Sequence, residues 1–249
     1  MTHLLSKSKY IRGLQCERAL WLDVHEPRLA RYTAEQMRRF DRGRDFEYAF
    51  KSQFPDGIDL SAELKRNVDA YPEYTARLLD AVGTRRAASA GDDANLDGGH
   101  GTPCPYKVVL FEAGFLYDDV LVLADVVQQR EDGTLDIYEV KSGTALSETY
   151  RRDAALQHYV ISHCREVHSY SVVYNGADGV DGSNGFNVVD LTEELAAQHG
   201  EIEKNIAAMK DILRHGEPAT PTGQHCLEPY ACPYQHYCAQ GVRQMSLFG

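Results

Sequence analysis

An acid and a lysine lie two positions apart in the segment IYEVKSGT at 137–144, which has the composition of a strand end. Because side chains alternate along a strand, Glu139 and Lys141 should point to the same face. Asp125, a lone acid in the apolar run LVLADVV, lies one hairpin away, where burial without a partner would be costly. A hard divalent metal ion held by Asp125 and Glu139 would offset that cost, and Lys141 could then position or deprotonate a metal-bound water that attacks phosphorus. The alternative is a surface ion pair between Glu139 and Lys141.

The elements that must position these residues follow from hydrophobic periodicity. Three β-branched and aromatic runs predict an antiparallel core, whose last two strands are joined by the turn signal Asp132-Gly133. Ser147 is the expected N-cap of the helix that follows. The predicted strands are 107–117, 119–129, 135–143, 168–175 and 186–190, and the predicted helices are 6–24, 34–54, 62–80 (interrupted by Pro72), 147–165 and 192–214.

Composition and charge limit the class of protein. The 249 residues can bury the core of one large domain, and no apolar run approaches the length of a membrane span. The start of the chain lacks an export signal, so we expect a cytoplasmic protein without membrane contact. The net charge of −11 argues against broad attraction to nucleic acid, yet Met1–Arg44 holds ten Lys or Arg against five acids. This local excess fits phosphate contacts or a solvated helix surface.

The order of these residues resembles a known family. Asp125, followed at a hairpin's distance by Glu139-Val140-Lys141 and then by a helix with Gln157, resembles the PD-(D/E)XK nuclease superfamily in its RecB-like branch. The resemblance covers nearly the whole chain and implies an α/β, restriction-endonuclease-like core, a mixed sheet flanked by helices. It implies that Asp125, Glu139 and the Val140 carbonyl bind Mg²⁺ or Mn²⁺. Lys141 would assist the attacking water, and Gln157 would orient the substrate or the lysine.

Two upstream acids and one missing tyrosine belong to the same comparison. Glu47 follows Gly43 by four residues, one helical turn apart on one face, where RecB-like enzymes carry a further metal ligand. Glu112 also has a counterpart in the family, but we expect it to be a strand-surface acid. Ile161 stands where the family's Q-x-x-x-Y motif has its tyrosine, so this chain has no tyrosine at that position to make the family's DNA contact.

The cysteines indicate metal or cluster chemistry, because disulfides are rare in a reducing compartment. Three tail cysteines at five-residue gaps, with one cysteine in the first helix, resemble the iron–sulfur exonucleases of the AddB and CRISPR-associated RecB-like type, and most closely an uncharacterised RecB-like subgroup. The resemblance implies a 4Fe-4S cluster that joins the tail to the N-terminal helix. Its ligands would be Cys16, Cys226, Cys232 and Cys238. Zinc is the alternative, bound by Cys₄ or by three Cys with His225 or His236. Cys104 and Cys164 are expected to be free thiols.

The organisation follows from these segments. We expect a single domain over 1–249, with an N-terminal helical part at 1–60, a nuclease core at 106–191 and a cluster-binding tail at 216–240. The terminal peptide at 243–249 resembles the short motif by which DNA enzymes bind sliding clamps, with Gln244, Leu247 and Phe248 as the contacting residues. Alternatively, its apolar side chains fold back onto the protein.

Taken together, the motifs predict a Mg²⁺- or Mn²⁺-dependent deoxyribonuclease. We expect an exonuclease that hydrolyses phosphodiester bonds of single-stranded DNA or DNA ends in repair, replication or defence. Two other classes stay open. One is a catalytically inactive nuclease fold that acts as a DNA-binding or sliding-clamp adaptor, and the other is a zinc-stabilised regulator without a metal site in the sheet.

Overall fold

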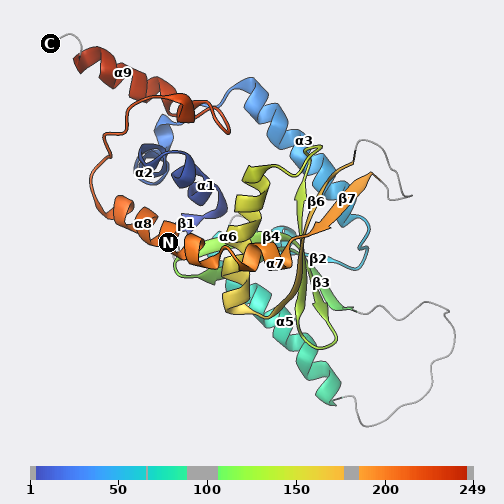
Figure 1. Ribbon diagram of the computed structural model, residues 1–249. Coiled ribbons are helices and arrows are strands. Elements are labelled where there is room, and N and C mark those ends of the chain that lie inside the picture. Colours follow the sequence, from blue (N-terminus) through green and yellow to red (C-terminus); the bar gives the residue numbers. More distant parts are fainter. Residues whose placement is uncertain (1–3, 66, 89–105, 177–184, 246–249) are drawn as a thin grey trace.

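The computed structural model describes residues 4–65, 67–88, 106–176 and 185–245. Within them, strands form one seven-stranded mixed sheet in the order β2-β3-β4-β5-β6-β7, with β1 paired to β4 (Figure 1). The strands are β1 (Leu5–Ser6), β2 (Ile58–Asp59), β3 (Tyr106–Tyr117), β4 (Val120–Arg130), β5 (Leu135–Lys141), β6 (Val167–Asn175) and β7 (Phe186–Asp190). A mixed sheet flanked by helices was predicted, and this part of the fold is confirmed.

The predicted antiparallel core is present as β3, β4 and β5. The hairpin between β4 and β5 turns at Gly133, whose φ of 93° lies in the left-handed region that glycine adopts without strain. Its amide donates to the Arg130 carbonyl at 3.0 Å. From β5 the chain crosses through α6 (Glu148–Cys164) to the parallel strand β6. Ser147 caps α6 as predicted, because its side chain accepts from the Tyr150 amide.

Alternating side chains of the central strands contribute to two different layers. Val126 and Val140 pack with Phe50 of α3 (Ala34–Lys51) in one apolar cluster. Val127 and Ile137, on the opposite face, belong to the main core together with apolar residues of α6. The side chains of α3 and α6 therefore approach the central strands from opposite faces.

Several predicted helices are divided. The predicted helix over 6–24 is two helices, α1 (Lys7–Gln15) and α2 (Glu17–His25), because Cys16 is extended with φ −165° and ψ 123°. The predicted helix over 192–214 is likewise α7 (Thr192–Ala196) and α8 (His199–Arg214). Pro72 does not interrupt a helix. It lies in the first turn of α5 (Tyr71–Ala88), where the missing amide hydrogen costs nothing.

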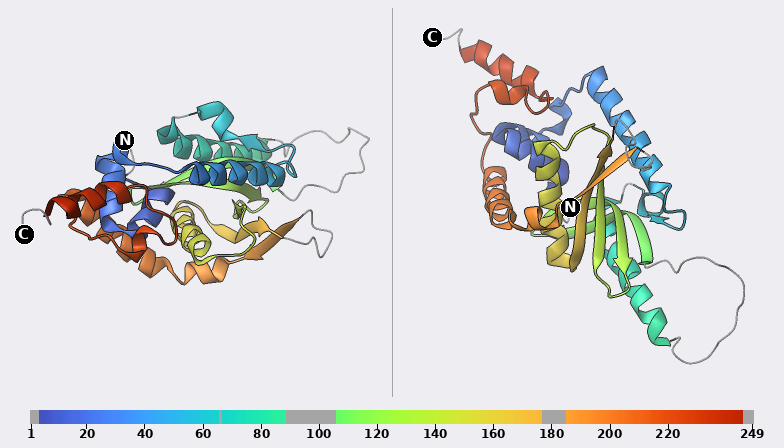
Figure 2. Two further views of the ribbon diagram at one scale, coloured as in Figure 1. Left: turned by 90° about the horizontal axis from the view of Figure 1, so that it is seen from above. Right: turned by 45° about the vertical axis from the view of Figure 1, so that its right-hand side comes forward.

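The remaining short elements complete the chain. They are the helices α4 (Leu60–Leu64) and α9 (Gln235–Met245), and the 3₁₀ helices η1 (Pro27–Leu29), η2 (Val68–Ala70) and η3 (Gln224–Cys226). In both views of Figure 2, α1, α2 and α9 lie together at one end of the molecule. The tail thus returns to the N-terminal helices, and its helix α9 was missing from the sequence prediction.

Candidate active site

Strands β4 and β5 separate at Asp125. Their backbone pairing ends at Val126 opposite Tyr138. Beyond this point the Val140 amide donates to Oδ2 of Asp125 at 2.7 Å, so a side chain accepts the hydrogen bond. Because the backbone pairing of β4 and β5 has ended here, this buried bond gives the Val140 amide an acceptor that it would otherwise lack. Further along β4, strand β1 pairs with the edge that β5 has left.

Two further acids meet Asp125. One carboxylate oxygen from each of Glu47, Glu112 and Asp125 lies within 4.8 Å of the others. Glu112 belongs to β3 but has a φ of 55°, a left-handed conformation that is uncommon for a residue other than glycine and often marks a functional site. Lys51, one turn after Glu47 in α3, contacts Glu47 and lies 2.6 Å from Oε1 of Glu112. Glu112 is therefore not the strand-surface acid that was expected, because it contacts Lys51 of α3 and lies within 4.8 Å of Asp125.

The electrostatics of these acids favour a cation. Burial, and then the charge of Glu139, raises the pKa of Asp125 well above its ordinary value. Burial also raises the pKa of Glu112 to about 6, although the Lys51 ammonium opposes the shift. Lys51 thus compensates part of the negative charge of three close carboxylates. Carboxylate oxygens are the ligands that Mg²⁺ prefers, so Glu47, Glu112 and Asp125 fit a divalent metal ion.

Glu139 has a different environment. Its Oε1 accepts from Lys141 Nζ at 2.5 Å and from Lys7 Nζ at 2.8 Å, while its side chain is 1% exposed. Lys141 also contacts Asp153 of α6, and Lys7 lies 3.9 Å from the same acid. Burial acts to raise the pKa of Glu139, but the two ammonium groups lower it to about 2. Glu139 is therefore buried and Lys141 half-buried, so the alternative of a surface ion pair is wrong.

Several polar atoms beside this cluster have no hydrogen-bond partner among the described residues. They are Oε2 of Glu139, Oδ1 of Asp153, both amide atoms of Gln157 and the hydroxyl of Tyr170. Gln157 follows Asp153 by one turn of α6, and its side chain is fully buried. Unpaired buried polar atoms are costly and are seldom kept without a function. These atoms mark a polar region that a ligand, a metal or water could complete.

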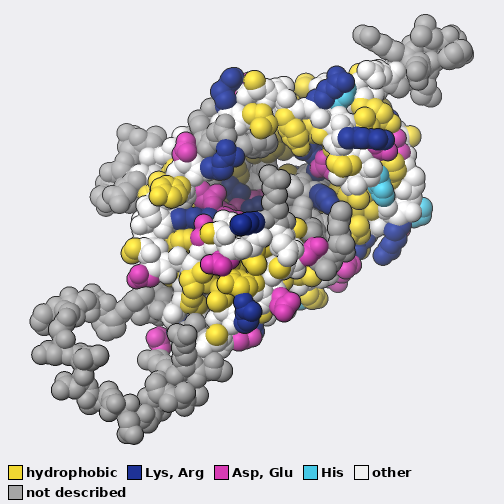
Figure 3. All heavy atoms as spheres, turned by 180° about the vertical axis from the view of Figure 1, so that it is seen from behind, with side chains coloured by type: hydrophobic (Ala, Val, Ile, Leu, Met, Phe, Trp, Pro, Cys, Tyr) yellow, Lys and Arg dark blue, Asp and Glu magenta, His cyan; other side chains and the backbone are white. Residues whose placement is uncertain are grey.

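The structure brings together most of the predicted catalytic residues and adds four. Glu47 lies with Asp125 in the group of three acids. Glu139 instead binds two lysines, and the role of the Val140 carbonyl stays a prediction. The added residues are Lys7, Lys51, Glu112 and Asp153. Two of them had a signal in the sequence. Glu112 has a counterpart in the family that the sequence resembles, and Asp153 lies four residues before Gln157 on one helix. Figure 3 shows basic and acidic side chains gathered around the hollowed middle of one face of the molecule.

The predicted cluster cysteines lie near one another in the tail region. Cys16, Cys232 and Cys238 share a small apolar cluster with Leu22. The Cys232 amide donates to the Cys226 carbonyl at 2.8 Å. Among the described residues, however, no three cysteine sulfurs lie within 4.8 Å of one another, so the thiols do not form a compact ligand set. The iron–sulfur cluster stays a prediction.

The other terminal and thiol predictions have limited structural outcomes. Cys164 is a free thiol, as predicted, and donates to the Leu116 carbonyl at 3.5 Å. Cys104, Leu247 and Phe248 lie outside the described residues. Gln244 lies in α9, but its side chain is outside the described part of the chain, so the clamp-binding peptide stays a prediction. No helix in the described ranges is both long enough and apolar enough to cross a membrane.

Comparisons with known proteins add little. The sequence matches no known family, and no curated protein matches it. Among solved structures, one described as the crystal structure of SSO0001 is similar to this chain with a TM-score of 0.34 and 12% sequence identity, over 84% of this chain and 98% of that chain. A likeness at this level carries no argument about function.

Proposed function

We propose that this protein is a metal-dependent deoxyribonuclease that hydrolyses phosphodiester bonds of single-stranded DNA or DNA ends. The observation that carries the proposal is the position of Asp125. Its carboxylate accepts the Val140 amide where β4 and β5 separate, and it lies within 4.8 Å of the carboxylates of Glu47 and Glu112. A cluster of acids in this position, beside the half-buried lysine Lys141, suits a reaction at a phosphate.

Each residue of the site has a separate task in this proposal. Glu47, Glu112 and Asp125 would hold Mg²⁺ or Mn²⁺, which supplies activation of water and neutralisation of charge on the phosphate. Glu139 offers the additional oxygen Oε2, which no described residue binds. The Lys141 ammonium, held by Glu139 on one side and α6 on the other, can donate a hydrogen bond to the attacking water or to a phosphate oxygen.

Digestion of end-labelled single-stranded DNA with Mg²⁺ or Mn²⁺ tests this proposal. Wild type should cleave in a metal-dependent manner, and Lys141→Met and Asp125→Asn should each lower the rate by about 100-fold or more. Lys204→Met is the matched control, because Lys204 is an exposed lysine of α8 and should leave the rate unchanged. Absence of cleavage by folded wild type with either metal would refute hydrolysis and favour the inactive DNA-binding alternative.

The proposal includes a 4Fe-4S cluster bound by Cys16, Cys226, Cys232 and Cys238. A single zinc ion holds thiolate sulfurs about 3.8 Å apart, given tetrahedral bonds of about 2.3 Å. Among the described residues, no three cysteine sulfurs lie within 4.8 Å of one another, so the choice between the cluster and zinc rests on the metal content of the protein. Protein purified without oxygen should contain about four iron atoms and about four sulfides per chain. About one zinc per chain and no iron would instead identify a zinc site.

A further inference from the structure

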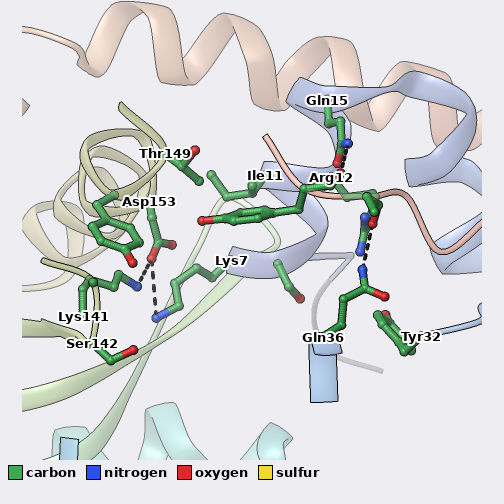
Figure 4. Close-up of a pocket in the computed structure, with 15 residues that line it drawn as sticks. Lys7, Ile11, Arg12, Gln15, Tyr32, Gln36, Lys141, Ser142, Thr149 and Asp153 are labelled. Atoms are coloured by element: carbon green, nitrogen blue, oxygen red, sulfur yellow. Dashed lines mark hydrogen bonds and ion pairs between the residues drawn. The ribbon is translucent and has the colours of Figure 1, made fainter. Parts of the chain in front are cut away.

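A cavity of about 580 Å³ opens beside the ion pair of Lys141 and Asp153 (Figure 4). Its walls come from α1, from the segment around the start of α3, from the turn between β5 and α6, and from residues 230–231 of the tail. Figure 4 shows Lys7, Lys141 and Asp153 at one end and Gln15 near the tail at the other. This volume suits a small organic ligand.

The charge of the lining favours an anion. Lys7, Arg12 and Lys141 line the cavity, and Asp153 is the one acid among its described lining residues. Asp153 is already in contact with Lys141. The Lys7 side chain is 29% exposed although its ammonium reaches the buried Glu139, so this side chain extends from the cavity wall into the site. A phosphate at this end of the cavity would therefore lie beside two ammonium groups, each of which also pairs with Glu139.

Three aromatic side chains belong to the rest of the lining. Tyr32, Tyr150 and Tyr230 line the cavity, and Lys141 Nζ lies 5.7 Å from the centre of the Tyr150 ring. Gln15 Nε2 donates to the Tyr230 carbonyl at 2.7 Å, which attaches the tail to α1. Tyrosine rings can stack on a nucleobase only when the base is exposed and unpaired. Ammonium groups at one end and rings along the wall match the two parts of a nucleotide.

We infer that this cavity binds one unpaired nucleotide next to the phosphate that is cleaved, with Lys7 and Lys141 at the phosphate and the tyrosine rings against the base. The inference rests on the proposed function and names its substrate as a single strand. A duplex does not fit, because paired and stacked bases present no free face to the rings and a cavity of about 580 Å³ is too small for a base-paired helix.

The test is equilibrium binding to metal-free protein in EDTA, measured by fluorescence anisotropy with a labelled oligothymidylate and with a blunt hairpin of the same length. The single strand should bind about tenfold more tightly than the hairpin, and thymidine 5′-monophosphate should compete with it. Lys7→Met and Tyr150→Leu should each weaken single-strand binding by about tenfold. Lys204→Met, which changes an exposed residue of α8, should bind like wild type.

The result does not depend on hydrolysis, so the failure of this inference and the failure of the nuclease proposal can be distinguished. Equal affinity for strand and hairpin would overturn the inference. The inference would also be overturned if Lys7→Met and Tyr150→Leu both bound the single strand as tightly as Lys204→Met. Gly143→Ala is a second variant should Tyr150→Leu not fold. A Cβ at position 143 would lie 2.6 Å from the Tyr150 hydroxyl oxygen and would displace that ring without removing it, with the same loss expected.

Discussion

The amide of Val140 donates to the carboxylate of Asp125 at 2.7 Å, at the point where two central strands separate. This bond fixes the orientation of an acid that also lies within 4.8 Å of the carboxylates of Glu47 and Glu112. Asp125 therefore completes the hydrogen bonding of β5 and contributes charge to the metal-capable group. Substitutions that keep the acceptor but remove the charge can separate these two contributions.

Asp125→Asn should keep the fold stable, because its amide oxygen can still accept from Val140 and one of several close negative charges is removed. We expect its free energy of unfolding in EDTA to equal or exceed that of wild type. Asp125→Ala leaves the Val140 amide buried without an acceptor and should cost about 1–3 kcal/mol. Urea unfolding of both variants measures the difference. Equal losses in both variants would contradict the assigned hydrogen bond.

Metal binding should stabilise the folded protein through Glu112. The free energy of unfolding of wild type should rise with Mn²⁺, by about 2.7 kcal/mol at a free concentration of about 100 times the dissociation constant. Glu112→Gln should lose most of this gain, because it removes one carboxylate of the close group. Asp211→Asn, an exposed acid of α8, is the control and should gain as wild type does. An unchanged gain in Glu112→Gln would place the metal elsewhere.

The sequence was informative wherever local pattern decides structure. The hairpin at Gly133, the cap at Ser147 and the shared face of Glu139 and Lys141 all depend on short-range spacing, and all three are present. Glu47, which the resemblance implied as a further metal ligand, lies within 4.8 Å of Asp125. These features can be predicted because turn chemistry and strand alternation act over a few residues.

The missed residues depend on long-range placement. Lys7 reaches Glu139 because the two-residue strand β1 pairs with β4, and two residues are too few to show a periodic pattern. Glu112 joins Asp125 through a left-handed backbone conformation that its residue type does not favour. The break at Cys16 likewise has no proline or glycine to announce it. Such contacts appear only when the tertiary structure is known.

Gln157→Leu should separate stability from activity. Both amide atoms of Gln157 are fully buried without a partner among the described residues, so an apolar side chain of similar size removes a desolvation cost. We expect the metal-free variant to be more stable than wild type by about 1 kcal/mol in urea unfolding. Its cleavage rate should fall by about tenfold, because the amide no longer orients Lys141 or the substrate. A less stable variant would show that the amide has a partner in solution.

The stability of the fold should decrease in mild acid because of His158. Burial, and then the neighbouring His199, lowers the pKa of His158 from 6.5 to about 4. The unfolded chain thus binds a proton at this imidazole more readily than the folded protein. The stability that His158 contributes is therefore fully present above pH 6.5 and is lost as the pH falls towards 4. Between about pH 7 and about pH 5, the loss of stability should be about 2 kcal/mol.

The control is His158→Gln, measured in the same buffers. It is needed because Glu112, with its pKa raised to about 6, stabilises the folded protein as the pH falls and so opposes the effect of His158. Urea unfolding should show a smaller acid-induced loss in His158→Gln than in wild type, and equal losses would mean that another group titrates.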